Sequence, residues 1–311
     1  MKFWRWAVAL LTALAVQIAA PVQALDSKTE KADNADDRVL LWYRNYDSPP
    51  VRALVALAFE KTPEYGPYIL GRSPEMSQGR ALRELREGKS GLVDIANVAS
   101  DAKREQELTV IPIPIDGGLL GLRVCVVRKD DLKKFKGIES VDDLSDRNIR
   151  IGQGTHWPDT SILQVNGIEV VTHSRYEILF RMLDSQRFEC FARGVSEVIY
   201  DLRLENNPDY VIEPELLIAY AMPSYFFVGK GNQQTAHRLQ LGMERAIIDG
   251  SFADYLDRFY SRAIQKLNLG SRRILLLDNP FLSRDSWRIG QRTLRDLRSR
   301  IDRMRQQSPP D

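Results

Sequence analysis

The sequence has few of the residues that build metal sites and disulfide scaffolds. Its 311 residues include two cysteines, too few for a disulfide-rich domain or a four-thiolate zinc site. The three histidines, His156, His173 and His237, lack the spacing of metal ligands. The chain also lacks a large excess of charge of either sign, because its 44 Lys and Arg nearly balance its 42 Asp and Glu. We therefore expect no metal, no cofactor and no nucleic-acid partner.

Long apolar runs are also absent, apart from residues 7–20. Two basic residues precede this run, and a small-x-small pattern ending at Ala24 follows it. An uncleaved membrane anchor needs about 20 apolar residues, and this run is shorter. The pattern is typical of a secretory signal peptide over 1–24, cleaved after Ala24. We expect a disordered polar leader over 25–37 and a mature protein exported to a bacterial periplasm.

The remaining sequence alternates between strand-like and helix-like stretches. Three strands separated by two helices fit between residues 39 and 98, which predicts a parallel sheet with right-handed crossovers. A second series of the same kind runs from about residue 122 to residue 191. Pro112 and Pro114 exclude a central strand over 110–115, so this stretch is an edge strand or a crossing between domains. The fold class predicted is α/β, with two domains.

Several short motifs occur in a fixed order along this alternation. They are Ser77-Gln78-Gly79-Arg80-Ala81-Leu82, Ser140-Val141-Asp142-Asp143-Leu144, Ile151-Gly152-Gln153-Gly154-Thr155 and Asp249-Gly250-Ser251-Phe252. Their order and spacing resemble those of the type II periplasmic solute-binding proteins, in particular family 3, the amino-acid-binding proteins of ABC importers. The resemblance covers about residues 38–266.

This resemblance implies a two-lobed fold in which each lobe is a mostly parallel sheet flanked by helices. Lobe 1 would comprise residues 38–117 plus 222–311, and lobe 2 residues 118–221. Two crossings, near residues 115–122 and 219–224, would join the lobes, and the ligand would lie in the cleft between the lobes. Proteins of this kind close around the ligand by a hinge motion.

The second lobe offers four candidate ligand-binding residues. Gly154 and Thr155 stand where a helix follows a strand, and free backbone N–H groups there would suit an anion, unless Thr155 only caps its own helix. Trp157 could stack on a ligand or simply pack. Arg193 follows a strand where amino-acid-binding relatives place an Asp, so it would offer a carboxylate or phosphate a bidentate fork, or else lie on the surface.

The first lobe offers the remaining candidates. Relatives carry an Arg after the third strand that clamps the ligand carboxylate, and the matching run here contains Ser100, Lys103 and Arg104. Lys103 is in strict register, and Arg104 stands one residue later. Tyr46 and Asp47, after the first strand, stand where relatives often have an aromatic wall, although Tyr46 could equally pack within its lobe.

Two further features remain open at this level. Cys125 and Cys190 fall on predicted strands of the second lobe and form either a disulfide or, slightly favoured, two buried free thiols. Residues 271–311 hold ten Arg and five acidic residues. Leu294, Leu297, Ile301 and Met304 follow at helical spacing, which predicts a terminal helix docked on lobe 1 with a solvated basic face. The alternative is a docking surface for a membrane partner.

The sequence therefore predicts a monomeric, non-enzymatic periplasmic solute-binding protein. Its ligand would be an amino acid, an organic acid or another small polar molecule with an anionic group, presented to an ABC permease or a membrane sensor. Two alternatives remain. One is a dehydratase-like enzyme on the same fold, for which Asp47 and Asp101 are the nearby carboxylates. The other is a signalling protein that binds a partner and has a degenerate, empty cleft.

Overall fold

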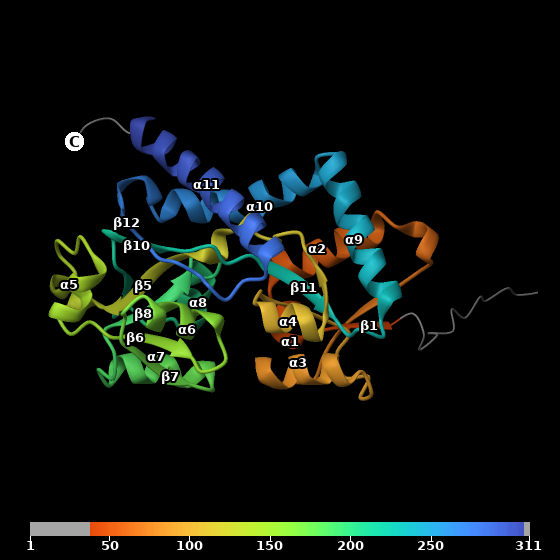
Figure 1. The fold of residues 1–311 in the computed structure, drawn as a ribbon, viewed down its shortest axis with the longest axis horizontal. Coiled ribbons are helices and arrows are strands. Elements are labelled where there is room, and N and C mark those ends of the chain that lie inside the picture. Colours follow the sequence, from red (N-terminus) through yellow and green to blue (C-terminus); the bar gives the residue numbers. More distant parts are fainter. Residues whose placement is uncertain (1–37, 308–311) are drawn as a thin grey trace, which may run out of the picture. The chain divides into compact units, whose positions relative to one another are not determined.

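A computed structural model describes residues 38–307, without the side chains of residues 262, 263, 300 and 304–307. The proposed signal peptide, its cleavage after Ala24 and the leader over 25–37 lie outside the described residues. No helix within 38–307 is long and apolar enough to cross a membrane. The described chain contains two open sheets flanked by helices, which confirms the predicted two-lobed α/β architecture (Figure 1).

The first lobe is built on a five-stranded sheet. Its order is β2-β1-β3-β11-β4, in which β1 pairs in parallel with β2 and β3, and β11 runs antiparallel to β3 and β4. The strands are β1 (Arg38–Leu41), β2 (Ile69–Arg72), β3 (Ile95–Ala99), β4 (Thr109–Ile111) and β11 (Ser224–Val228). Strand β4 lies at the sheet edge and ends before Pro112, as the prolines predict.

Six helices belong to this part of the chain. They are α1 (Tyr43–Tyr46), α2 (Pro49–Glu60), α3 (Gln78–Glu87), α4 (Ala102–Glu107), α9 (Gln233–Ile248) and α10 (Ser251–Lys266). Local signals fix some of their ends. The hydroxyl of Ser77 accepts a hydrogen bond from the backbone N–H of Arg80, and Gly88 ends α3 in the left-handed conformation.

The second lobe is built on a seven-stranded sheet. Its order is β12-β10-β5-β8-β6-β7, with β9 paired to β5. The strands are β5 (Leu122–Arg128), β6 (Ile151–Gly154), β7 (Val170–His173), β8 (Cys190–Gly194), β9 (Tyr210–Ile212), β10 (Leu216–Ala219) and β12 (Arg273–Leu276). The helices are α5 (Val141–Asp146), α6 (Pro158–Val165), α7 (Tyr176–Asp184) and α8 (Val198–Glu205). Ser140 and Asp143 form a capping box that starts α5.

The expectation that residues 222–311 lie wholly in lobe 1 is wrong at β12. This strand pairs in parallel with β10, so the chain returns to the second sheet after α10. The paired residues are 57 positions apart in sequence, and such long-range contacts leave no local signal. The other predicted boundaries of the two lobes stay predictions.

The terminal helix α11 (Arg284–Gln307) packs on the segments that cross between the sheets. Thr293 lies against Gly118 of the first crossing, and Gly290 lies against Ala221 and Pro223 of the second. Figure 1 shows α11 extending from the first lobe over the second. The predicted inward residues Leu294, Leu297 and Ile301 are buried, whereas the side chain of Met304 is not described. The helix therefore covers both crossings, not lobe 1 alone.

The two cysteines are bonded to each other. Cys125 on β5 and Cys190 on β8 form a disulfide with their Cα atoms 5.0 Å apart, so the slightly favoured pair of free thiols is wrong. The two strands pair antiparallel, with Cys125 opposite Ala192. This places the cysteines close enough to bond across the centre of the second sheet.

Candidate functional site

A cavity of about 620 Å³ opens between the two sheets. The first lobe contributes α1, the start of α3 and the end of β3 to its wall. The second lobe contributes the β6–α6 turn, the end of β8 and helix α8. The volume is in the range of small-molecule sites. The carboxyl ends of parallel strands meet at such a crevice, so this is where an open α/β sheet binds ligands.

Buried arginines and carboxylates form the floor of this cavity. Arg123 Nη2 lies 2.7 Å from Asp159 Oδ1, and Arg123 Nε donates to the Tyr220 hydroxyl at 3.2 Å. Tyr220 itself donates to Asp159. These three residues come from β5, α6 and the second crossing, so the network joins the hinge to the second lobe. Because each member has partners, the network is a structural part of the site.

Arg193 lies beside this network and is also buried. Its Nε donates to Asp201 Oδ2 at 2.7 Å, and Nη2 lies 3.2 Å from Glu197 Oε2. The guanidinium stacks near Trp157, with 5.0 Å from its central carbon to the ring centre. Arg193 therefore lines the cavity, and the alternative of a surface arginine is wrong. Its fork faces two carboxylates of its own lobe.

Glu197 is shared between the two arginines. Its Oε2 lies 3.2 Å from Arg193 Nη2 and 3.6 Å from Arg123 Nη1, while its side chain remains partly exposed to the cavity. Burial acts to raise its pKa, but the positive charges of Arg193, Arg123 and Arg44 outweigh burial and hold the pKa below its usual range. Glu197 therefore stays ionised and places a negative charge where a ligand would lie.

Two other polar groups line the cavity, the carboxyl of Asp116 and the hydroxyl of Tyr176. Burial raises the pKa of Asp116 to about 6, and the nearby charge of Glu197 adds to the effect. The hydroxyl of Tyr176 is buried and, among residues 38–307, has no hydrogen-bond partner of standard geometry. Arg44 of the first lobe stacks on the Tyr176 ring at 4.1 Å, so this contact spans the cleft.

The β6–α6 turn differs from its predicted role. The backbone N–H of Thr155 donates to the carbonyl of His173, and the Thr155 side chain is exposed. Helix α6 begins three residues later, at Pro158, with Trp157 as its N-cap, so Thr155 neither caps the helix nor offers a free N–H. Gly154, Thr155 and Trp157 nevertheless line the cavity.

Trp157 is held against the protein from two sides. Its ring stacks on Phe191 at 6.2 Å and lies over Gly154, where an added Cβ would come within 2.5 Å of the ring. Both proposed roles, packing and ligand stacking, are compatible with this position, because Trp157 also lines the cavity. Contact of these turn residues with a ligand stays a prediction.

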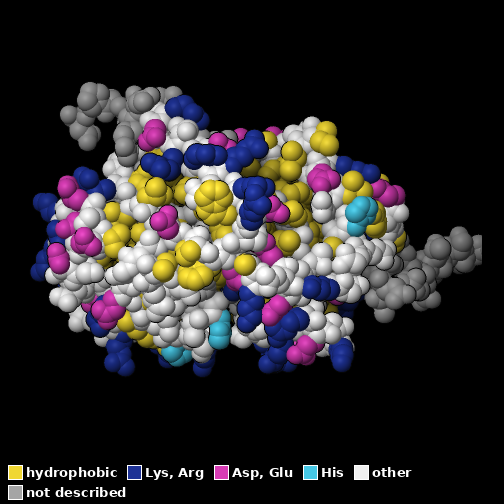
Figure 2. All heavy atoms as spheres, in the orientation of Figure 1, with side chains coloured by type: hydrophobic (Ala, Val, Ile, Leu, Met, Phe, Trp, Pro, Cys, Tyr) yellow, Lys and Arg dark blue, Asp and Glu magenta, His cyan; other side chains and the backbone are white. Residues whose placement is uncertain are grey.

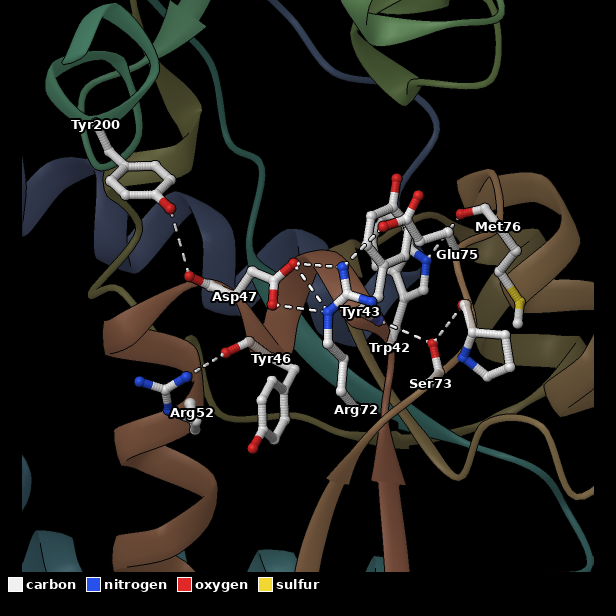
Figure 3. A network of polar contacts seen from close by, with 11 residues as sticks. Trp42, Tyr43, Tyr46, Asp47, Arg52, Arg72, Ser73, Glu75, Met76 and Tyr200 are labelled. Carbon is white, nitrogen blue, oxygen red and sulfur yellow. Dashed lines mark hydrogen bonds and ion pairs between the residues drawn. The ribbon is translucent and has the colours of Figure 1, made fainter. Parts of the chain in front are cut away.

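Tyr46 and Asp47 do not line the cavity. Asp47 forms an ion pair with Arg72, whose Nη2 lies 2.8 Å from Asp47 Oδ2 (Figure 3). The Arg52 guanidinium lies 5.2 Å from the centre of the Tyr46 ring. Helix α1 starts directly after β1 and turns these two residues away, so its first turn, with Tyr43 and Arg44, faces the cavity instead.

Of the three candidates that follow β3, Arg104 is the one that lies at the cleft. Lys103 is exposed, and the hydroxyl of Ser100 donates to Glu105 at 2.5 Å, so neither residue lines the cavity. Arg104 is largely buried at the edge of the cleft. It donates to the carbonyl of Ala99 at 2.6 Å and across the cleft to the carbonyl of His156 at 3.0 Å. The guanidinium that the resemblance implied for a ligand carboxylate thus donates to protein carbonyls instead.

Sequence reasoning missed the carboxylates of the cleft. It named Asp47 and Asp101, but Asp101 caps α4 and pairs with Arg104, at 3.0 Å between Oδ2 and Nε. The carboxylate residues that line the cavity are Asp116, Asp159, Glu177, Glu197 and Asp201. Glu197 and Asp201 precede and begin α8, a helix that the spacing of Val198, Ile199 and Leu202 could have indicated.

Solved structures share this architecture at low sequence identity. An arginine-specific periplasmic binding protein of Salmonella typhimurium superposes with a TM-score of 0.52 at 17% identity, over 72% of this chain and 99% of the other. An ancestral amino-acid-binding protein, a precursor of cyclohexadienyl dehydratase, gives 0.52 at 14% identity, over 72% and 96%. A histidine kinase sensor domain similar to periplasmic binding proteins gives 0.51 at 13%, over 72% and 97%.

The chain has the type II periplasmic-binding-protein fold. At the level of the fold, this confirms the resemblance that the motifs indicated. No protein-family model and no curated protein matches the chain in sequence. Since each of the three structures is almost fully covered while about a quarter of this chain is left over, the chain carries segments beyond the shared fold.

Proposed function

We propose that this chain is a periplasmic solute-binding protein that takes a small polar ligand into the cleft between its lobes. It would then present the ligand to an ABC permease or a membrane sensor. The observation that carries the proposal is the cavity of about 620 Å³, which both lobes line and whose polar groups point inward. The buried hydroxyl of Tyr176, which has no partner of standard geometry within residues 38–307, supports it, because such a group gains a hydrogen bond when a ligand arrives.

The charges of the cavity favour a ligand that carries both signs. Arg193 could receive an anionic group, as the sequence suggests, and Arg44 adds a second cation to the cavity wall. Glu197 and Asp201 lie beside Arg193, so a purely anionic ligand would meet two negative charges there. A zwitterion with the size of an amino acid satisfies both sets of groups. The chain lacks the Asp that the resemblance would place after β8. Glu197, the N-cap of α8, and Asp201 on α8 would supply the negative charge in its place.

The test is a binding screen followed by one substitution. A thermal-shift screen of amino acids, organic acids and sugar phosphates should show a shift with amino acids, and calorimetry then gives the affinity. Glu197→Gln keeps the shape and removes the charge, so affinity should fall by about tenfold or more. Glu87→Gln, exposed on α3, is the control and should bind as the parent does.

Arg193→Ala is the less useful variant. Burial of Arg193 means that its removal leaves Asp201 and Glu197 without their partner, and loss of one member of a buried pair costs about 3–5 kcal/mol. The buried geometry therefore predicts that Arg193→Ala loses stability as well as affinity. A shift with organic acids alone would instead favour the purely anionic ligand, and no shift with any ligand would favour a partner-binding signalling protein.

An enzyme on the same fold is the second candidate. A carboxyl with a pKa of about 6 that lines a ligand cavity, as Asp116 does, is suited to proton transfer. Any ligand that the screen finds should therefore be incubated with the protein and followed by NMR. Product formation that Asp116→Asn abolishes would establish an enzyme, whereas an unchanged ligand supports the binding protein.

A further inference from the structure

Helix α11 presents two different sides. Its inner side is docked, with Leu294, Leu297 and Ile301 buried and Gly290 in contact with Ala221 and Pro223. Six arginines of this helix have exposed side chains: Arg284, Arg288, Arg292, Arg295, Arg298 and Arg303. The helix is thus fixed to the body of the protein while its outer side faces solvent.

The exposed arginines follow a line along the helix. Arg284, Arg288, Arg292 and Arg295 are spaced by four, four and three residues, which places them on one stripe opposite the buried residues. From Arg284 to Arg303 the stripe is about 28 Å long at the rise of an α-helix. Figure 2 shows Lys and Arg side chains gathered over α11, with apolar groups beside them. We call these six arginines the α11 arginine stripe.

Protein carboxylates neutralise little of this charge. Within the described part of the chain, the stripe has one ion pair, between Arg288 Nη1 and Asp285 Oδ1 at 3.5 Å, and both side chains are more than half exposed. Asp296 and Asp302 are the other exposed acids of the helix. Six arginines against three aspartates leave the outer face with an excess of three positive charges, on a chain whose total is +2.

Two aromatic side chains lie exposed at the start of the helix. Trp287 is 49% exposed and Phe281, in the segment just before the helix, is 39% exposed. Arg284 and Arg288 flank Trp287 in sequence. Indole rings next to cationic side chains favour the boundary between water and lipid, where the ring meets acyl chains and the guanidinium meets headgroups.

We propose that the α11 arginine stripe, with Trp287 and Phe281, docks the protein on an anionic phospholipid surface. Guanidinium groups pair with phosphates in a bidentate manner, and a long row of them matches a plane of many phosphates better than one compact ligand. The helix is held rigidly by its inner side, so docking orders no further chain. The proposal does not depend on what the cleft binds.

The test is cosedimentation of the full chain with lipid vesicles. The protein should bind vesicles of phosphatidylcholine mixed with phosphatidylglycerol, bind phosphatidylcholine alone weakly, and lose affinity as salt rises. The variant with Arg284→Glu, Arg288→Glu, Arg292→Glu and Arg295→Glu should lose affinity for the mixed vesicles by on the order of a hundredfold. Trp287→Ala should weaken binding while leaving its salt dependence.

A matched variant controls for total charge. Arg83→Glu, Lys89→Glu, Arg181→Glu and Arg187→Glu reverse the same number of exposed cations on other helices and loops, and this variant should bind like the parent. Residues 1–37 are common to all variants and cannot cause a difference between them. Equal losses in both variants, or undiminished binding of the stripe variant, would overturn the proposal. Binding to poly-glutamate but not to vesicles would overturn it in favour of an acidic protein partner.

Discussion

Gly154 illustrates how a single residue shapes the wall of the cleft. A Cβ at this position would lie 2.5 Å from Cε2 of Trp157, closer than two carbon atoms can approach. The backbone carbonyl of Gly154 also accepts hydrogen bonds from the N–H of Trp157 and the hydroxyl of Thr160. Glycine is therefore required here by close packing and not by backbone conformation.

We predict that Gly154→Ala displaces the Trp157 ring and destabilises the protein by about 1–3 kcal/mol. Denaturant unfolding measures the free energy, and near-ultraviolet circular dichroism reports the ring environment. Gly231→Ala is the matched control, because a Cβ there meets nothing within 4 Å. If both variants unfold at the same denaturant concentration as the parent, the close contact does not exist in solution.

Asp116 combines structural and electrostatic roles in the first crossing. The backbone N–H of Gly118 donates to its Oδ1 at 3.0 Å, and the hydroxyl of Ser196 donates to its Oδ2 at 3.3 Å. Burial nevertheless raises its pKa to about 6, helped by the charge of Glu197. An unfolded aspartate has a pKa of about 3.9, so the folded protein holds this proton over a range where the unfolded chain has released it.

Asp116 therefore makes the folded protein less stable as pH rises from about 4 to about 6. The penalty is constant above that range and amounts to about 3 kcal/mol. Asp116→Asn removes it, so the free energy of unfolding of the variant minus that of the parent should grow from near zero at pH 4 to its full value at pH 7. A difference that is the same at every pH would show that Asp116 keeps an ordinary pKa.

At the scale of elements, the disulfide ties two strands that are distant in sequence. Cys125 on β5 and Cys190 on β8 are 65 residues apart, and a cross-link of that span restricts the unfolded chain by about 4 kcal/mol. We predict that the Cys125→Ala/Cys190→Ala variant loses about this much stability in thermal or denaturant unfolding. Reductant should destabilise the parent and leave the variant unchanged. Insensitivity of both to reductant would mean that the bond is not formed.

Elements differ in how far the sequence predicts them. The bounds of α3 are encoded locally, because Ser77 and Gly88 act on the backbone within one turn. Strand β12 coincides with an apolar stretch of the sequence, but its place in the second sheet depends on pairing with β10, which no local residue encodes. The sequence places Arg193 at the cleft but not its partners Glu197 and Asp201, because the pattern of α8 can indicate a helix without showing which residues its carboxylates contact.

At the scale of the whole described chain, the lobes are joined at more places than the two crossings. Arg104 donates to the carbonyl of His156 across the cleft, and Arg44 stacks on Tyr176. On the other side, the Asn279 side chain donates to the carbonyl of Ala221 in the second crossing. Helix α11 covers both crossings through Gly118 and Gly290. A hinge between the lobes would have to bend underneath this helix.

We therefore predict that α11 restrains hinge motion, and that Gly290→Leu releases it. A Cβ added at Gly290 would lie 3.1 Å from the Ala221 side chain and 3.3 Å from Pro223. The larger side chain of leucine would therefore push the helix away from the second crossing. Spin labels attached at Glu87→Cys and Ser145→Cys, exposed on α3 and α5, report the distance between the lobes by electron double resonance. The parent should give one narrow distance distribution and Gly290→Leu a broad one, whereas Gly231→Leu, at an open position, should match the parent. A broad distribution in the parent would show that α11 leaves the hinge free.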